Sequence, residues 1–288
     1  MYESLRLLGQ LKSSGDPFSR ITSRMPEHYA LGLAVCFSDD GSYAGLAQKR
    51  NDGSLAFKKA HSAASSLPIP VTMVSGRPHN TINRLKNTLE QFGNTQELGE
   101  FAEFCQQAFA SWKAQEKILN NEIMDTLSAM QRDNESIFLY AAHDDPSLTP
   151  LTENEALKQF FTEGYVQGNF GNCGRMACHK DKGVCSVCGQ KGVTVYGNFS
   201  LIACYNLDKE SVIAGGFSPE RAADNFPVCA DCILDIGDGF KYAQNELTSY
   251  LSGFQYMALP KALTGDEALN QQIIDELIRI SRRDRLLS

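Results

Sequence analysis

Four of the nine cysteines form two Cys-x-x-Cys pairs, a spacing typical of zinc ligands. Cys185 and Cys188 lie in the segment VCSVCGQ, and Cys229 and Cys232 lie in PVCADC. A two-residue gap lets two thiolates reach one metal from a tight turn, and two such turns complete a tetrahedral Zn²⁺ site with Zn–S distances of ~2.3 Å. Four protein ligands leave no open position, so the sequence predicts one structural zinc ion rather than a catalytic one.

The residues beside each pair suit this role. Gly189 follows the first pair, where the chain often needs a positive φ. The second pair leads into ILDIGDGFKYAQNEL, so its sulfurs are expected near a helix N-terminus, where amide groups and the helix dipole favour thiolate over thiol. Because 40 residues separate Cys188 from Cys229, the metal is expected to close a folded insertion rather than a minimal finger.

Other readings of the cysteines stay open at this point. The two pairs are alternatively buried thiols, or one of them is a redox couple. Cys173, Cys178 and His179 lie just upstream and are possible competing ligands, although Cys-x₄-Cys-His is less apt for one metal. Three further cysteines lie in apolar runs and are predicted core residues: Cys36, Cys105 and Cys204.

The first third of the chain predicts a helix, a hairpin and an irregular connection. Leucines recur on one stripe of a helix over 3–12. Residues 29–37 are largely apolar, and a second strand-like run begins at Tyr43 after an Asp-Asp-Gly turn, which predicts a β-hairpin. From about 62 to 80 the chain is rich in Ser, Pro and Gly and is predicted to be irregular.

The rest of the chain is predicted to be mainly helical around the cysteine-bearing segment. Spacings of three and four residues predict a helix over 80–92 and one or two long helices over 97–133, and 136–142 is a candidate buried strand. From 184 to 232 the composition changes to cysteines and short β-type runs. Three more helices are predicted, over about 153–164, 233–252 and 265–283.

Together these patterns predict an α+β fold, with mixed helices and short antiparallel strands and a four-cysteine zinc-binding insertion. We expect an N-terminal α+β region over 1–150 and a zinc-binding region with flanking helices over 151–288. The chain is long enough to build its core without disulfide staples.

Composition excludes several classes of protein. With 42% hydrophobic and 21% charged residues in 288, the chain is not disordered throughout. It has no run of roughly 18 apolar residues, and its N-terminus does not resemble a signal peptide, so no membrane insertion and a cytoplasmic location are expected. The net charge of −7 argues against a basic coat over the whole surface, but residues 1–93 carry 11 Lys and Arg against 7 Asp and Glu, which permits a local phosphate-binding face.

The cysteine segment resembles a known family. The succession VCSVCGQ, VYGNFSLIACYNLDKESVIAGGF and NFPVCADC, followed by a helix with Gly237 and Gly239 and then FQYMALPK, is similar to the zinc-binding region of the large subunit of type I-B CRISPR Cascade complexes. The opening helix and the hairpin after it are also arranged as in the N-terminal part of that family. The resemblance is most specific over about 184–261.

The resemblance implies an RNA-guided DNA surveillance role. In such assemblies base pairing with the guide reads the sequence, while a protein subunit reads a short flanking motif (the PAM) on duplex DNA and helps start strand separation. The implied partners are the guide crRNA, target double-stranded DNA, the Cascade backbone and crRNA 5′-end-capping subunits, small subunits, and a separate nuclease-helicase recruited on target binding. The chain itself is then not an enzyme.

Two groups of residues are candidates for nucleic-acid binding. The loop 167–183 has a net charge of +2, glycines that allow close backbone approach, and side chains that can read base edges. Basic residues near the N-terminus can bind phosphates on DNA or guide RNA. The first group comprises Asn169, Asn172, Arg175, Lys180 and Lys182, and the second comprises Arg20, Arg24, Lys49, Arg50, Lys58 and Lys59. For the loop, the alternatives are a solvated connector or a loop packed on a partner subunit. For the N-terminal residues, the alternative is scattered solubilising charge.

No catalytic arrangement is evident in the sequence. The histidines are isolated, the Asp pairs lie in turn contexts, and no Gly-x-x-x-x-Gly-Lys-Ser/Thr loop is present. Two further hypotheses remain beside the surveillance subunit: a zinc-stabilised scaffold or adaptor that binds only proteins, and a Cys-x-x-Cys oxidoreductase. Bound zinc with unreactive thiols would disfavour the oxidoreductase.

Overall fold

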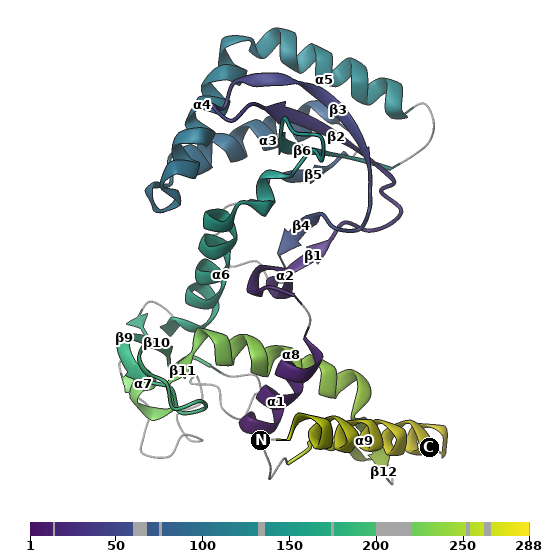
Figure 1. Ribbon diagram of the computed structural model, residues 1–288, viewed down its shortest axis with the longest axis vertical. Helices are drawn as coiled ribbons and strands as arrows, with labels where there is room; N and C mark the ends of the chain where they lie inside the picture. Colours follow the sequence, from purple (N-terminus) through teal and green to yellow (C-terminus); the bar gives the residue numbers. More distant parts are fainter. Residues whose placement is uncertain are drawn as a thin grey trace. The chain divides into compact units, whose positions relative to one another are not determined.

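The structure is a computed structural model that describes residues 1–13, 15–59, 68–74, 77–131, 136–173, 176–199, 221–251, 254–261 and 266–287 (Figure 1). Its contacts divide the chain into two compact units, which we call the sheet unit (residues 21–165) and the cysteine unit (residues 1–20 with 166–288). Helices are mixed with short, mainly antiparallel strands, which confirms the predicted α+β class. The division into domains at residue 150 stays a prediction.

The sheet unit is built on four strands in the order β3-β2-β6-β5. β2 (Leu31–Phe37) pairs antiparallel with β3 (Tyr43–Arg50), and this confirms the predicted hairpin. β6 (Ile137–His143) lies parallel to β2, and β5 (Val71–Met73) pairs antiparallel with β6 at the edge. β5 corrects the expectation of an irregular connection there, because its burial on the sheet outweighs the turn-forming residues around it.

Three helices between β5 and β6 pack on one another and on the strands: α3 (Pro78–Gly93), α4 (Glu100–Ala114) and α5 (Glu116–Gln131). The region predicted as one or two long helices is therefore two. β2 and β6 are buried along almost their whole length, which explains why both read as continuous apolar runs rather than alternating ones. At the centre Trp112 of α4 is fully buried and stacks on Phe37, with ring centroids 6.4 Å apart.

Shorter elements complete this part of the chain. β1 (Thr22–Arg24) pairs antiparallel with β4 (Ala56–Lys59). The unit boundaries fall within two helices, α2 (Pro17–Ile21) and α6 (Glu155–Phe170), of which α6 extends six residues beyond its predicted end near 164. Two short 3₁₀ turns lie at Gln96–Leu98 and Leu151–Glu153.

In the cysteine unit the two helices α1 (Tyr2–Lys12) and α8 (Ala230–Glu246) lie against each other although they are more than 200 residues apart in sequence (Figure 1). Glycines make this close packing possible. A Cβ on Gly9 would overlap the carbonyl oxygen of Asp235, and a Cβ on Gly239 would overlap that of Leu5. The first helix of the chain is thereby joined to the helix that carries Cys232.

The cysteine segment itself forms a three-stranded antiparallel sheet in the order β11-β10-β9. Its strands are β9 (His179–Val184), β10 (Lys191–Tyr196) and β11 (Val228–Cys229). The pair β7 (Asn172–Cys173) and β8 (Met176–Ala177) precedes it, and α7 (Ala222–Asn225) leads into β11.

The C-terminal part contains a strand pair that the sequence did not predict. The helix expected over 233–252 ends at Glu246, because β12 (Thr248–Leu251) leaves it to pair with β13 (Phe254–Met257). α9 (Glu267–Leu287) packs against β12, and the buried Ser249 hydroxyl lies 2.8 Å from that of Ser281. Among the described helices, none combines the length and apolar character that spanning a bilayer requires.

Candidate functional site

The two cysteine pairs come together at the junction of the small sheet and α8. The first pair lies in the tight turn between β9 and β10, and the second lies where β11 enters α8. β10 pairs with β11 through Val195 and Cys229, which brings the second pair next to the first. All four sulfurs lie within 4.8 Å of one another, in what we call the four-cysteine cluster: Cys185, Cys188, Cys229 and Cys232.

The turn that carries the first pair has the conformation expected for a metal knuckle. The amide of Gly189 donates to the carbonyl oxygen of Cys185 at 2.9 Å, and Cys185 in turn donates to that of Gln190 at 2.9 Å. Gly189 has φ +75°, as the sequence predicted, in the left-handed region that favours glycine. A Cβ there would meet nothing within 4 Å, so the backbone angle and not crowding requires glycine.

The separations match a tetrahedral zinc site. A tetrahedron with Zn–S bonds of ~2.3 Å places its sulfurs about 3.8 Å apart. The Sγ atoms of Cys188 and Cys229 are 3.8 Å apart. Three of the four cysteines are buried and Cys188 is partly exposed, so the cluster is closed to solvent except at one corner. The donor set, spacing and burial therefore fit Zn²⁺ as the metal that this cluster can hold.

Backbone N–H groups prepare one thiol for ionisation. Burial opposes the charge of Cys185, but N–H donors from Cys188, Cys229 and Val187 outweigh it and lower its pKa from 9.0 to about 7. The Cys229 amide lies 3.4 Å from the Cys185 sulfur. Burial and the neighbouring Cys185 raise the pKa of Cys229 to about 12, and burial also raises that of Cys232. Without a metal only some of the four thiols can ionise, because their negative charges would lie close together. A bound dication would let all four become thiolates.

Cys229 caps the N-terminus of α8 and Cys232 lies in its first turn. This is the position that the sequence predicted for the second pair, where the helix dipole favours negative charge. The cluster therefore ties together three strands and a seventeen-residue helix, and through that helix it reaches α1. A metal at this place would act on the architecture of the whole cysteine unit.

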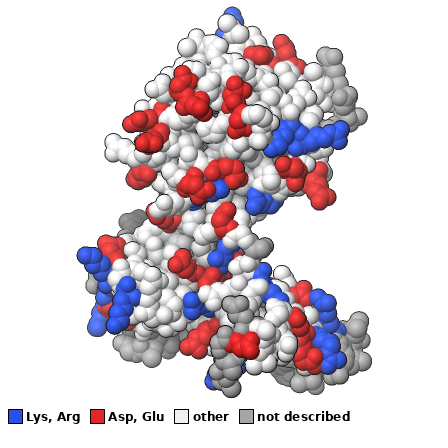
Figure 2. Space-filling view, in the orientation of Figure 1, with Lys and Arg blue, Asp and Glu red and all other residues white. Residues whose placement is uncertain are grey.

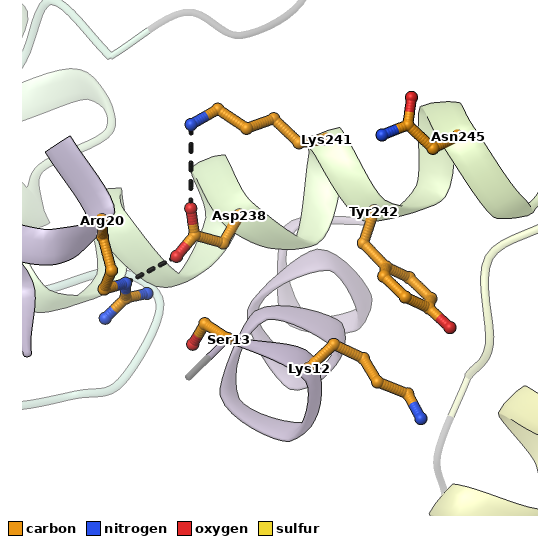
Figure 3. Close-up of a pocket in the computed structure, with 7 residues that line it drawn as sticks. All are labelled: Lys12, Ser13, Arg20, Asp238, Lys241, Tyr242 and Asn245. Carbon is orange, nitrogen blue, oxygen red and sulfur yellow. Dashed lines mark hydrogen bonds and ion pairs between the residues drawn. The ribbon is translucent and has the colours of Figure 1, made fainter. Parts of the chain in front are cut away.

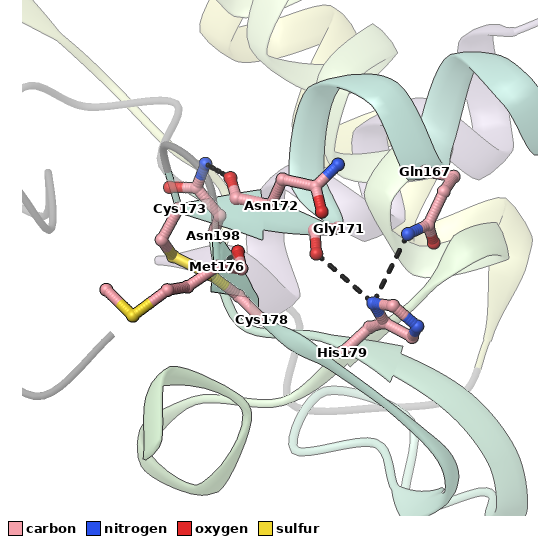
Figure 4. The surroundings of a disulfide bond; sticks show 8 residues. All are labelled: Gln167, Gly171, Asn172, Cys173, Met176, Cys178, His179 and Asn198. Atoms are coloured by element: carbon pink, nitrogen blue, oxygen red, sulfur yellow. Dashed lines mark hydrogen bonds between the residues drawn. A yellow bond between two sulfur atoms is a disulfide. The ribbon is translucent and has the colours of Figure 1, made fainter. Parts of the chain in front are cut away.

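The upstream group does not join the cluster among the described residues. Cys173 and Cys178 are bonded to each other as a disulfide across β7 and β8, with Cα atoms 5.9 Å apart (Figure 4). The His179 Nδ1 atom lies 3.2 Å from the Gly171 carbonyl oxygen and 3.2 Å from Gln167 Nε2. The competing-ligand alternative is thus not supported by the described geometry.

Residues 182–288 match the family model of the CRISPR-associated protein TM1802 (cas_TM1802) central domain. The matched segment contains the four-cysteine cluster, α8, the β12–β13 pair and α9. No curated protein matches the chain, and no solved structure matches it. The match supports a CRISPR-associated protein, as the resemblance implied.

The loop candidates for nucleic-acid binding are spread over several elements. Asn169 lies near the end of α6, and Asn172 is exposed in β7. Lys180 in β9 is ion-paired with Asp224 of α7, whereas Lys182, two residues on, is exposed. Arg175 lies outside the described residues.

The N-terminal candidates divide between the two units. In the sheet unit, Arg24 donates to the Ser54 carbonyl oxygen, and Lys49 bonds the Ser147 carbonyl oxygen at 3.1 Å. Arg50 is exposed at the end of β3. Lys58 and Lys59 lie in β4, where their backbones pair with Ser23 and Thr22; their side chains lie outside the description.

Arg20 belongs instead to the cysteine unit, where it contacts α8. Its Nε donates to Asp238 at 2.5 Å (Figure 3). Its Nη2 donates to Asp235 at 2.8 Å. Burial opposes its charge, but the hydrogen bonds to these carboxylates outweigh burial and raise its pKa. These contacts were not predicted, because nothing in the sequence relates Arg20 to carboxylates more than 200 positions away.

Charge on the face drawn in Figure 2 is interspersed rather than gathered into one basic field. Several basic residues are paired with carboxylates, as Lys180 is with Asp224 and Lys86 with Glu116. The pairing shows which candidates are already engaged, a distinction that the sequence does not contain.

Proposed function

We propose that this chain is a non-catalytic subunit of an RNA-guided DNA surveillance complex. In this role it recognises a short flanking motif on the target duplex and helps start strand separation, while base pairing with the guide reads the rest of the target. Cleavage belongs to a separate nuclease-helicase that is recruited after target binding. Zn²⁺ is the resident ion of the four-cysteine cluster and acts structurally.

The observation that carries this proposal is the match of residues 182–288 to a CRISPR-associated family model. The cluster lies within that segment, and its four ligands leave no coordination position for a substrate. A structural metal at the base of α8 suits a subunit that must hold a fixed binding surface in a larger assembly.

The proposed partners are the guide crRNA, the target duplex, and the backbone, 5′-end-capping and small subunits of the complex. The segment from Asn169 to Lys182 is the proposed motif-reading loop, because amide and guanidinium groups read base edges in the major groove. Basic residues of the sheet unit such as Arg50, which is exposed, are proposed to contact phosphates.

Purification of the assembled complex tests the proposal. The tagged chain is co-expressed with a guide RNA and the other subunits, and the purified material is assayed for RNA and for about one zinc per chain. Binding to target duplexes that carry randomised flanking positions then measures motif preference. Copurification of RNA and a motif preference that disappears without the chain support the proposal, and a complex that binds identically without the chain refutes it.

Substitutions separate base reading from phosphate binding. Arg175→Ala and Lys182→Ala should relax the preference for one flanking motif while nonspecific affinity stays similar. Arg50→Ala should weaken all duplexes alike and reduce the salt slope by about one. If neither loop variant changes motif preference in the assembled complex, this loop is not the reader.

A second candidate function is a zinc-stabilised scaffold or adaptor that binds only proteins. The aromatic residues of the β12–β13 pair favour it, because Phe254 is 79% exposed and Tyr250 is 51% exposed. Exposed aromatic groups of this kind are frequent at protein interfaces. Phe254→Ser that abolishes assembly, combined with no affinity of the chain for any nucleic acid, would favour the scaffold.

A further inference from the structure

Cys173 and Cys178 form a disulfide in the cysteine unit, outside the four-cysteine cluster (Figure 4). The bond joins β7 to β8, two strands of two residues each. The two cysteines are five positions apart, and a disulfide that closes so short a loop stabilises a fold less than one that joins distant segments. The predicted location of the chain is the cytoplasm, where thiols are kept reduced and most disulfides are transient or redox-sensing. Both points favour a reversible bond over a permanent one.

The two cysteines of this bond differ in their accessibility. Cys178 is 1% exposed, whereas Cys173 in β7 is partly exposed. Exchange begins when a thiolate attacks one sulfur of a disulfide, so access helps to decide which sulfur is attacked. A thiol from solvent therefore reacts at Cys173. Burial makes Cys178 a poorer leaving group, which lowers the rate of the reaction but does not redirect the attack.

Backbone hydrogen bonds keep Cys178 anchored when the disulfide is broken. Its amide donates to the Gly171 carbonyl oxygen at 2.8 Å, and its own carbonyl oxygen accepts from the Gly197 amide at 2.7 Å. β7 is held by its short pairing with β8 and by an exposed hydrogen bond of 2.6 Å from Asn198 Nδ2 to the Asn172 carbonyl oxygen. Reduction should therefore loosen β7 and leave Cys178 in place.

We propose that the Cys173–Cys178 bond is a reversible thiol–disulfide site that a low-molecular-weight thiol attacks at Cys173 Sγ. The attacking thiolate forms a new S–S bond with Cys173 while the bond to Cys178 breaks, and the electron pair leaves on Cys178 Sγ, which takes up a proton. A second thiolate attacks the sulfur of the bound small molecule and releases Cys173, which is also protonated. Two small thiols are thereby oxidised to one disulfide, and the protein disulfide is reduced to two thiols.

This inference goes beyond the proposed function and does not depend on it. The strand that reduction loosens contains Asn172, a residue of the proposed motif-reading loop. The redox state of the bond therefore determines how firmly Asn172 is held.

Trapping of the mixed disulfide tests which sulfur is attacked. The full chain is purified without reductant in the presence of zinc, mixed with reduced glutathione as the probe, quenched with acid and digested for mass spectrometry. Glutathione should be about tenfold or more enriched on Cys173 over Cys178. Cys36 and Cys105 are buried and should stay unmodified while the chain is folded, so they serve as internal controls.

Two single substitutions form a matched pair, because each removes the disulfide and leaves one of its cysteines. With oxidised glutathione, Cys173 in the Cys178→Ser variant should form its adduct about tenfold or more faster than Cys178 does in the Cys173→Ser variant. Modification of Cys36 would reveal a variant that fails to fold. The trapping experiment on the unmodified chain then decides the matter.

Reversibility is measured in glutathione buffers with stepped ratios of reduced to oxidised glutathione. Half-reduction of the bond should fall within the series and should be reached from either starting state. Hydrogen exchange in the peptides that contain β7 and β8 should be faster in the reduced chain, with exchange over 228–236 unchanged.

Three results would overturn the inference: a disulfide that persists in a large excess of reduced glutathione, an adduct found mainly on Cys178, or equal rates for the matched variants while Cys36 stays unmodified. Motif preference of the assembled complex is a separate measurement and decides the proposed function. A failure of one is therefore distinguishable from a failure of the other.

Discussion

Buried cysteines lie in both units, but their surroundings differ. In the sheet unit burial raises the pKa of Cys36 from 9.0 to about 11 and that of Cys105 to about 12. In the cysteine unit Cys185 is equally inaccessible, yet backbone N–H groups lower its pKa to about 7. Burial raises the pKa of Cys229 as well, so within the cluster it is the donors aimed at the Cys185 sulfur that outweigh burial and favour one thiolate.

The two units also differ in what stabilises their sheets. The strands β2 and β6 of the sheet unit are covered along almost their whole length, and helix side chains as large as Trp112 pack on them. The β9–β11 sheet has few buried apolar side chains, and β9 is mostly exposed. A small sheet of this kind needs a disulfide or a structural metal for stability, and the cluster lies where its strands meet α8.

Removal of the metal should give the largest difference between the units. Structural zinc sites contribute about 10–16 kcal/mol of apparent binding free energy at neutral pH, so a strong chelator should unfold the β9–β11 sheet and loosen α8. Hydrogen exchange followed by mass spectrometry should show fast exchange over 179–196 and 228–236, with the sheet unit unchanged. Cys232→Ser should reproduce this effect.

Cys105→Ala serves as the control for the loss of a buried cysteine. Its zinc content should equal that of the unmodified chain, because Cys105 lies in α4 and is not among the four ligands. A folded, metal-free preparation of the unmodified chain with slow exchange over 179–196 would contradict the proposed role of zinc.

Truncation of Trp112 should destabilise the sheet unit and leave the cysteine unit unchanged. Trp112 is fully buried, stacks on Phe37, and donates from Nε1 to Asn120 at 3.0 Å, so Trp112→Ala should cost the sheet unit about 3–5 kcal/mol. Exchange should accelerate in β2, β6 and the helices while zinc content stays the same. Lys113→Ala, one residue further on the exposed side of α4, should change the free energy of unfolding by no more than about 0.5 kcal/mol.

The sequence predicted the β2–β3 hairpin and the grouping of the four cysteines for a physical reason. Continuous apolar runs such as 31–37 and the two Cys-x-x-Cys spacings are local patterns that need no knowledge of tertiary contacts. The β12–β13 pair was missed because 248–251 continues a helical pattern, and only pairing with 254–257 favours strand. The Arg20 contacts were missed because they join α2 to carboxylates of α8 that are more than 200 positions away.

The packing of α1 on α8 also joins segments that are distant in sequence, and two glycine substitutions in α8 test it. A Cβ on Gly239 would overlap the Leu5 carbonyl oxygen, whereas a Cβ on Gly237 would meet nothing within 4 Å. Gly239→Ala should therefore destabilise the cysteine unit by about 2 kcal/mol through overpacking, and Gly237→Ala should stabilise it by about 0.5–1 kcal/mol as a helix former. Urea unfolding monitored by exchange in α1 measures both, and equal effects of the two substitutions would contradict the close packing.

Substitution of Gly189 should have the smallest effect of these changes. It tests the contribution of backbone conformation to the cluster separately from that of packing. Gly189 has φ +75° and open space around its Cα, so Gly189→Ala introduces backbone strain and no overlap. The strain should cost about 1 kcal/mol, which corresponds to about a fivefold loss of zinc affinity in competition with a chromophoric chelator. Gly189→Asn should recover part of this loss, because asparagine tolerates the left-handed region better than alanine. Equal affinities for the alanine and asparagine variants would show that the turn relaxes when the metal binds, and that the sulfurs rather than the backbone define the site.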